Sequence, residues 1–342
     1  MTSEESAEVP REQGWGLPLL AGFLLLILPA MPPLGIMMPV AQTLVMVAPA
    51  LAVAAVVGWR AGGRLQLAVV WTLFAVWVLW LPSNAGTYAV LVRGWGALLA
   101  ASFGGVLLSG WGERFLPRAL LAVAISLVVG ALALLIAGQG FTEVGAVLTD
   151  EVARRSEIAQ AAWREFVAHP RWQEIVRENP DAGALSEQVE QQFAMVPTLA
   201  RQIAPAMLAL ESLAVLALSW ALYHRFGRVR LGPPLAALRD LRFDDNCVWG
   251  FIAGLLVLVV PVPGIVRTLG LNLLVFFGVL YALRGLGVML WFLSPGRWMK
   301  VLLTLVLVLF SQIVLLVAVG IGLGDTWLDW RRRPRPKSQR SE

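Results

Sequence analysis

The sequence holds few of the residues on which metal sites and disulfides depend. Its 342 residues include one cysteine, Cys247, and two histidines, His169 and His224. A single cysteine excludes an internal disulfide and a cysteine metal cluster. Two histidines far apart in the sequence make a poor metal site, because zinc sites take three or four protein ligands. We therefore expect neither a metal nor another cofactor.

Signatures of catalysis are also missing. No glycine-rich loop ending in Gly-Lys-Ser or Gly-Lys-Thr occurs, which excludes ATP hydrolysis by that route. No Ser-His-Asp or Cys-His combination can be proposed with any specificity. The sequence therefore predicts a protein that is not an enzyme.

Charge is scarce as well, since only 14% of the residues are charged and 58% are hydrophobic. Soluble domains carry about 25% charged residues. The uncharged residues form long runs, which is the pattern of membrane-spanning helices. The net charge of +5 comes mainly from arginines in short connections and in the C-terminal tail. The positive-inside rule accounts for that placement, so we expect no nucleic-acid partner.

The apolar runs predict an all-α, polytopic integral membrane bundle of about eight to nine helices, whose first partner is the lipid bilayer. A helix needs about 20 residues to cross the hydrocarbon core. Tryptophans near the run ends support the boundaries, because indole rings favour the headgroup level. The leader before the first run is acidic, so we expect that run to be retained and not cleaved as a signal peptide. The predicted spans are residues 17–30, 34–57, 65–81, 85–109, 116–137, 203–223, 247–263, 269–293 and 301–322.

A polar insertion at 142–202 interrupts the apolar runs. It carries ten acidic residues and six arginines, with apolar residues at helical spacing. We interpret it either as an extramembrane helical hairpin or as a dedicated cap for a ligand or a protein partner. The predicted regions are a polar tail (1–14), a five-span bundle (15–141), the insertion, a bundle of three to four spans (203–324) and a basic tail (325–342).

Loop charge predicts the orientation. Four basic loops fall on one side of the membrane if the N-terminus is cytoplasmic, which leaves the acidic insertion outside. This predicts a multi-pass protein of the bacterial inner membrane. Nine spans would place the basic tail outside, against the same rule, so one span near the C-terminus must be re-entrant or absent. The run at 247–263 is the weakest, because Pro261 and Pro263 shorten its helix.

Several short motifs resemble the YybS-like family of uncharacterised multi-pass bacterial membrane proteins. They lie near both ends of the chain, so that the resemblance covers nearly all of it. The motifs are Pro33-Leu34-Gly35, Gly58-Trp59-Arg60, the stretch from Arg242-Phe243-Asp244 to Trp249, Asn272, Tyr281-Ala282-Leu283-Arg284-Gly285-Leu286, Gly324-Asp325 and Asp329-Trp330-Arg331.

That family is distantly similar to the substrate-binding S components of energy-coupling-factor transporters. The resemblance implies a helical bundle that holds a small molecule. S components commonly present an Ala-x-x-x-Ala face on their first helix, where a coupling subunit docks. Here Ala21 is followed by Leu25, which departs from that pattern.

Three charged residues, Arg93, Glu211 and Arg284, fall inside predicted spans. Each would cost at least about 2.5–3.5 kcal/mol if it faced lipid at mid-bilayer, so each should face protein or water. Arg93 shares a helix face with a stripe of small residues, Gly96, Ala100 and Gly104, which lets another helix approach closely.

Matched depth suggests that Arg93 and Glu211 form a buried ion pair, since each lies eight residues into its span. A ligand or proton site at these residues is the alternative. Arg284 lies nearer a span end and could extend to the interface. Asp325 and Asp329 are interpreted as a solvated helix end beside Arg331. Polar residues in or at the edges of spans predict interhelical hydrogen bonds or substrate contacts; they are Gln42, Asn84, Asn272 and Gln312.

The leading hypothesis is a transporter-like or small-molecule-binding membrane protein without its own ATPase. Its candidate ligand-binding residues are Arg93, Glu211, Arg284 and Asn272. The alternative is a membrane scaffold or envelope-assembly protein that meets a protein partner through the insertion. A pocket at the buried residues would favour the first, and an exposed apolar patch on 142–202 would favour the second.

Overall fold

The computed structural model describes residues 36, 39–82, 86–138, 140–293, 296 and 311–332, and every regular element among them is a helix. The all-α prediction is therefore confirmed. The elements are α3 (Val40–Arg60), α4 (Leu65–Trp80), α5 (Gly86–Leu108), α6 (Phe115–Ile136), α7 (Phe141–Ala168), α8 (Pro170–Glu178), α9 (Pro180–Phe226), η2 (Leu238–Asp240), α10 (Cys247–Val259), α11 (Gly264–Leu293), α13 (Ser311–Leu328) and η3 (Trp330–Arg332).

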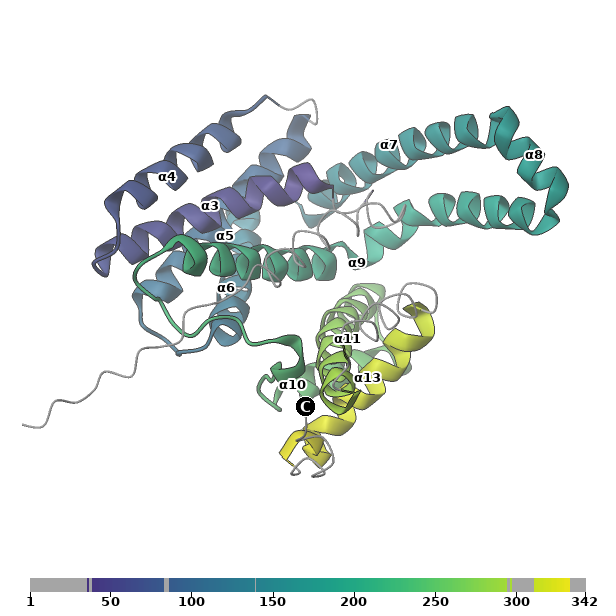
Figure 1. The fold of residues 1–342 in the computed structure, drawn as a ribbon. Coiled ribbons are helices and arrows are strands. Elements are labelled where there is room, and N and C mark those ends of the chain that lie inside the picture. Colours follow the sequence, from purple (N-terminus) through teal and green to yellow (C-terminus); the bar gives the residue numbers. More distant parts are fainter. Residues whose placement is uncertain are drawn as a thin grey trace, which may run out of the picture. The chain divides into compact units, whose positions relative to one another are not determined.

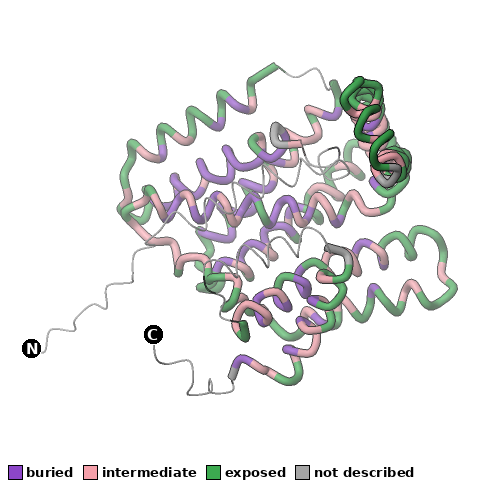
Figure 2. The backbone as a smooth tube through the Cα atoms, turned by 45° about the vertical axis from the view of Figure 1, so that its right-hand side comes forward, coloured by how far each residue is buried: buried purple, intermediate pink, exposed green. Residues whose placement is uncertain are grey.

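Five of the described helices are long and apolar enough to cross a membrane: α3, α5, α6, α9 and α11. Three shorter apolar helices, α4, α10 and α13, match further predicted spans. The run at 17–30 and residues 301–310 lie outside the described part of the chain. Figure 2 shows buried residues along α3, whereas α4 carries mainly exposed ones. Several exposed side chains of α4 are large and apolar, such as Leu73 and Trp77, which suits a helix that faces lipid.

The last part of the insertion, from Pro180, and the sixth predicted span form one continuous helix, α9, of 47 residues. The predicted boundary at 202/203 falls inside this helix, because charge gives way to apolar residues without a helix end. At 1.5 Å per residue α9 is roughly 70 Å long, more than twice the hydrocarbon core of about 30 Å. Its first half pairs with α7, and α8 joins the two at the far end (Figure 1). The contacts include a 2.9 Å hydrogen bond from Ser156 to the carbonyl of Phe193.

The chain divides into two compact units, of which the first comprises residues 1–204 and 208–235. Its centre is α3, which packs on α4, α5 and α9. The predicted small-residue stripe of α5 faces α3, since a Cβ added at Gly96 would lie 3.1 Å from the carbonyl oxygen of Val45. Ala100 in the same stripe is buried. The close helix contact predicted from this stripe is therefore present, and its partner is α3.

The second unit comprises residues 205–207 and 236–342, and its helices also pack through glycines. A Cβ on Gly254 of α10 would lie 2.8 Å from the carbonyl oxygen of Gly270 on α11. A Cβ on Gly285 of α11 would overlap the carbonyl of Ala318 on α13, and one on Gly322 of α13 would overlap that of Tyr281. Without side chains at these positions the backbones can approach closely, as is typical of helices packed inside a membrane.

Hydrogen bonds connect three of the predicted polar segments. Arg118 donates to the carbonyls of Gly112 and Leu231, both at 2.6 Å, and so joins the loop after α5 to the loop after α9. The latter loop continues to residue 246. Arg331, at the start of the basic tail, donates to the carbonyls of Arg239 (3.1 Å) and Leu241 (2.9 Å) in that loop. The described start of the tail therefore packs against residues 239–241 of this loop.

This arrangement predicts that two single-thiol proteins react from the same side of the membrane. The native thiol is Cys247, at the first residue of α10. The second is a Ser338→Cys change in a Cys247→Ser background; position 338 lies outside the described residues. A membrane-impermeant maleimide should label both only after access to the cytoplasmic side is provided. Labelling of the two thiols from opposite sides would contradict the shared side of loop and tail.

Candidate functional site

A buried carboxyl group occupies the interior of the first unit. Glu211 of α9 is only 4% exposed. Its Oε2 accepts a hydrogen bond from Gln42 Nε2 at 2.8 Å, and its Oε1 accepts one from Thr43 Oγ1 at 3.0 Å. Both donors are neutral and belong to the first turn of α3. Among the described residues, no lysine, arginine or histidine lies within ion-pair distance of this carboxyl.

The hydrogen-bonded network continues from Glu211 toward the hairpin that α7, α8 and the first half of α9 form. Tyr88 of α5, which is buried, donates its hydroxyl proton to Gln42 Oε1. The guanidinium of Arg155 on α7 lies over the Tyr88 ring, 4.6 Å from its centroid. Side chains from α3, α5, α7 and α9 therefore meet at one place. Of these, only Gln42 and Glu211 had been singled out in the sequence, because Arg155 lies far away in an insertion whose packing has no sequence signature.

The outer end of this network is an ion-pair cluster on α7. Glu151 is bound by Arg154 Nη2 at 2.7 Å and by Arg155 Nε at 2.8 Å. Burial opposes the charged form of the Glu151 carboxyl. The hydrogen bonds and charges of Arg154 and Arg155 outweigh it and hold the pKa of Glu151 below its usual range. The cluster therefore keeps its ionic form at neutral pH.

Arg93 and Glu211 have different partners in the structure, contrary to the predicted ion pair. Arg93 is partly buried and donates a hydrogen bond to the carbonyl of Leu81, directly after the last residue of α4. A cation suits that position, because the last carbonyls of a helix lack intrahelical partners and carry partial negative charge. Arg93 thus caps α4.

The rotation of α5 about its axis explains why Arg93 and Glu211 do not form an ion pair although they lie at the same depth. The depths do agree, since Trp95 Nε1 on α5 donates to Ser212 Oγ on α9 at 2.9 Å. However, successive residues of an α-helix point about 100° apart, so Arg93 points roughly 200° away from Trp95. The face of α5 that meets α9 is therefore the one opposite Arg93.

Arg284 is buried in the second unit and forms two ion pairs there. Its Nε lies 2.9 Å from Asp325 Oδ2, and its Nη1 lies 2.9 Å from Asp245 Oδ1. Arg331 Nη2 also binds Asp325 Oδ2, at 2.6 Å. Asp325 is 1% exposed, so the predicted solvated helix end is wrong. Arg284 on α11 and Arg331 after α13 both bind Asp325, and these contacts hold the Arg284 side chain inside the second unit.

Asn272 uses its amide to join two segments of the second unit. Its Oδ1 accepts a hydrogen bond from the backbone N–H of Ala206 at 2.8 Å, and its Nδ2 donates to the carbonyl of Thr268 at 2.8 Å. Ala206 directly follows Pro205, whose ring disturbs the helical hydrogen-bond ladder. Asn272 therefore compensates for a proline in a helix. Asn84 lies outside the described residues, as does the side chain of Gln312.

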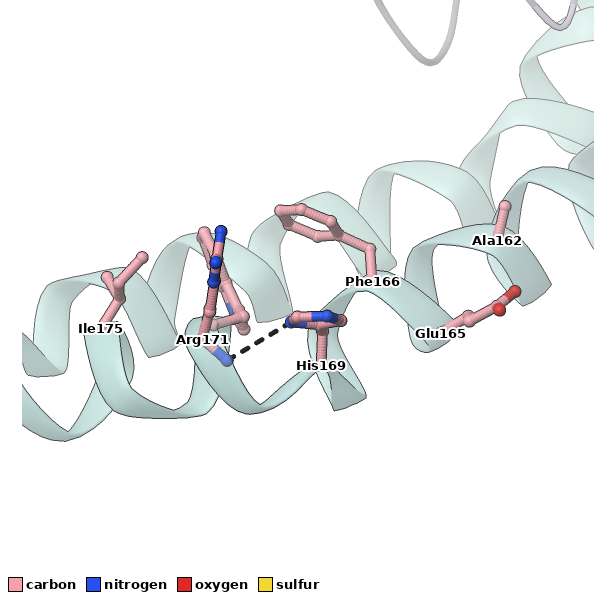
Figure 3. Close-up of a pocket in the computed structure, with 7 residues that line it drawn as sticks. Ala162, Glu165, Phe166, His169, Arg171 and Ile175 are labelled. Atoms are coloured by element: carbon pink, nitrogen blue, oxygen red, sulfur yellow. Dashed lines mark hydrogen bonds between the residues drawn. The ribbon is translucent and has the colours of Figure 1, made fainter.

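The corner between α7 and α8 carries an open pocket (Figure 3). Phe166 and Trp172 lie there with ring centroids 5.1 Å apart. His169 caps α8 by accepting a hydrogen bond from the N–H of Arg171 at 3.4 Å. The second histidine, His224, is buried against Trp220. The pocket-lining residues are Ala162, Glu165, Phe166, His169, Arg171, Trp172 and Ile175.

Comparison with known proteins places this architecture in a family. Residues 23–326 match the model of a family described as predicted membrane protein (DUF2232). The chain belongs to the DUF2232 family. No curated protein and no solved structure matches it. As a DUF2232 protein with several apolar helices, it is a multi-pass membrane protein that lies in the lipid bilayer.

The description of the DUF2232 family names no functional site, so the candidate site is chosen from the geometry of the structure. Arg93, Arg284 and Asn272 each serve a helix end, an ion pair or a backbone group within the protein. Glu211 is the remaining predicted residue, and it is a buried acid with neutral hydrogen-bond donors. It is therefore the candidate functional residue of this DUF2232 protein.

Proposed function

We propose that this protein is a transporter-like, small-molecule-binding membrane protein, and that its site is the network of Glu211, Gln42, Thr43 and Tyr88. The observation that carries the proposal is the Glu211 carboxyl, which is buried in a candidate membrane span and held by neutral donors alone. An ionisable group inside a membrane span is costly and commonly marks a ligand, ion or proton pathway.

The cost of this arrangement supports a functional reading of Glu211. A buried charge that lacks a partner costs several kcal/mol, and apolar residues of similar volume are often as stable as a buried ion pair. Arg284 illustrates the structural solution, since two carboxylates surround it. Glu211 lacks an ion-pair partner among the described residues, so its carboxyl suits a cation or proton that binds and leaves.

The protein acts without an ATPase of its own and is not an enzyme in this proposal. The sequence contains no glycine-rich phosphate loop, so any energy for transport has to come from an ion gradient or from another protein. The charge distribution of its loops favours the bacterial inner membrane.

A ligand survey of the purified full-length protein by thermal shift tests this proposal. A ligand present at 100 times its dissociation constant stabilises the folded state by about 2.7 kcal/mol. Glu211→Gln should abolish most of that stabilisation, because it removes the charge while keeping the size of the side chain. Ser126→Ala is the matched control, since Ser126 is buried in the same unit but bonds only to its own helix at Ala122. Ligands whose stabilisation is the same in wild type and Glu211→Gln would exclude Glu211 as the site.

A specific observation favours the hairpin as a second candidate. Phe166 and Ile175 at the pocket are 50% and 47% exposed, on an insertion that extends beyond the membrane-spanning part of α9. Exposed apolar groups at an open pocket suit a protein partner, as in a scaffold or an envelope-assembly protein. In that case Phe166→Ser should abolish complementation of a deletion strain, whereas Glu211→Gln should complement as well as wild type.

A further inference from the structure

Arg155 connects the hairpin to the Glu211 network and sits in a cage of its own. Its guanidinium covers the face of the Tyr88 ring at 4.6 Å. Its Nε donates to Glu151 Oε1 at 2.8 Å, and its Nη1 donates to the carbonyl of Ile36 at 3.2 Å. The side chain is 16% exposed, so solvent reaches the cage. An aromatic face, a carboxylate and a carbonyl are the groups that recognise an organic cation.

A chain of side-chain contacts connects Arg155 to Glu211. The two are linked through Tyr88, whose hydroxyl donates to Gln42, and through Gln42, which donates to Glu211. A cation in the cage therefore belongs to the same network as the buried acid.

Arg155 can leave the cage without leaving the Glu151 carboxylate unpaired. Glu151 also holds Arg154, through Nε at 2.9 Å and Nη2 at 2.7 Å. This bidentate pair keeps the Glu151 carboxylate compensated when Arg155 departs. A cationic ligand can then take the place that Arg155 vacates on the Tyr88 ring.

We propose that the Arg155 guanidinium is a tethered occupant of a binding site for a small organic cation, such as an amine or a guanidinium compound. Resting on the function proposed above, this assigns the ligand class of the Glu211 site. The ligand's cationic head displaces Arg155 from the Tyr88 ring. Glu151 and the Ile36 carbonyl bind its N–H groups, and Glu211 supplies the second negative charge.

The test uses methylguanidinium as the probe, with full-length protein in detergent at constant ionic strength. Arg155→Ala removes the tethered occupant and leaves room for the probe. We expect saturable stabilisation by methylguanidinium, with a dissociation constant about tenfold lower in Arg155→Ala than in wild type. Adding Tyr88→Leu or Glu211→Gln to Arg155→Ala should raise that constant by about tenfold again. Sodium chloride at equal concentration is the control for ionic strength.

Arg155→Lys keeps a cation in the cage and provides a second variant if Arg155→Ala folds poorly. It should bind methylguanidinium no better than wild type. The cation site would be overturned if methylguanidinium bound saturably to neither wild type nor Arg155→Ala. It would also be overturned if adding Tyr88→Leu to Arg155→Ala left the binding unchanged. An uncharged ligand that is lost in Glu211→Gln but unaffected at Arg155 would overturn the ligand class alone. Ligands insensitive to Glu211→Gln would instead contradict the proposed function.

Discussion

Asp325→Ala should destabilise the second unit by about 3–5 kcal/mol, because it leaves buried arginines without their carboxylate. Asp325 Oδ2 binds Arg284 at 2.9 Å and Arg331 at 2.6 Å. Arg284 retains Asp245, but the Asp245 side chain is 63% exposed and compensates weakly. Arg331 retains only backbone carbonyls among its described bonds, at residues 239 and 241. The measurement is equilibrium unfolding of the purified protein in mixed micelles.

Asp240→Ala is the control for the removal of an aspartate. Asp240 lies 3.2 Å from Arg239, and both side chains are more than half exposed. Such surface pairs contribute about 0–1 kcal/mol, so this variant should unfold almost as wild type does. Replacing Arg284 and Arg331 by methionine together with Asp325→Leu should cost much less than Asp325→Ala, because no buried charge is left unpaired and Asp245 is solvent-exposed. Equal stability of Asp325→Ala and wild type would show that the ion-pair cluster contributes nothing.

Gly322→Leu should separate α11 from α13 and lower the stability of the second unit by about 3 kcal/mol. Even a single added carbon at Gly322 would overlap the carbonyl of Tyr281. The obstacle is backbone, which cannot rotate away as the end of a side chain can. The helices therefore have to move apart, and the buried contacts of Tyr281 and Ala318 open.

Gly320→Leu is the matched control on the same helix, two residues earlier. A Cβ at Gly320 would meet nothing within 4 Å. The two variants add the same side chain to α13, and only one adds it at the crossing. If both unfold at the same denaturant concentration, the α11–α13 contact is not as close as described. If only Gly320→Leu lost stability, the face of α13 that contacts α11 would be the one that carries Gly320, and not the one that carries Gly322.

The residues that sequence reasoning placed best are those whose position depends on nearby residues. Gly96, Ala100 and Gly104 recur along one helix face, so their role in close packing follows from helical period alone. The short helix within the run at 247–263 could be predicted for the same reason, because nearby prolines limit it. Pro261 and Pro263 predicted a short helix, and α10 ends at Val259, after 13 residues. The boundary at 203 was missed because a change from polar to apolar composition does not end a helix, as α9 demonstrates.

The partners of the buried charges could not be predicted, because they depend on which way a helix faces. Arg93 and Glu211 have the same depth, and depth is what position in a span reveals. The rotation of α5 turns Trp95 toward Ser212 and Arg93 toward Leu81. Asp325 was interpreted as solvated because charged residues follow it at 329 and 331–333. Its partners nevertheless include Arg284, 41 residues away.

The sequence by itself determined that this protein is an all-α, multi-pass membrane protein, since hydrophobic length and scarcity of charge are properties of each segment alone. It also determined which polar residues are costly in the membrane. The tertiary structure decided which of those residues are compensated and placed Arg155 of a distant insertion over the Tyr88 ring, in the network of Glu211. The physical reason is that burial and pairing are properties of the packed helices together, and a local pattern carries no information about what lies across a helix interface.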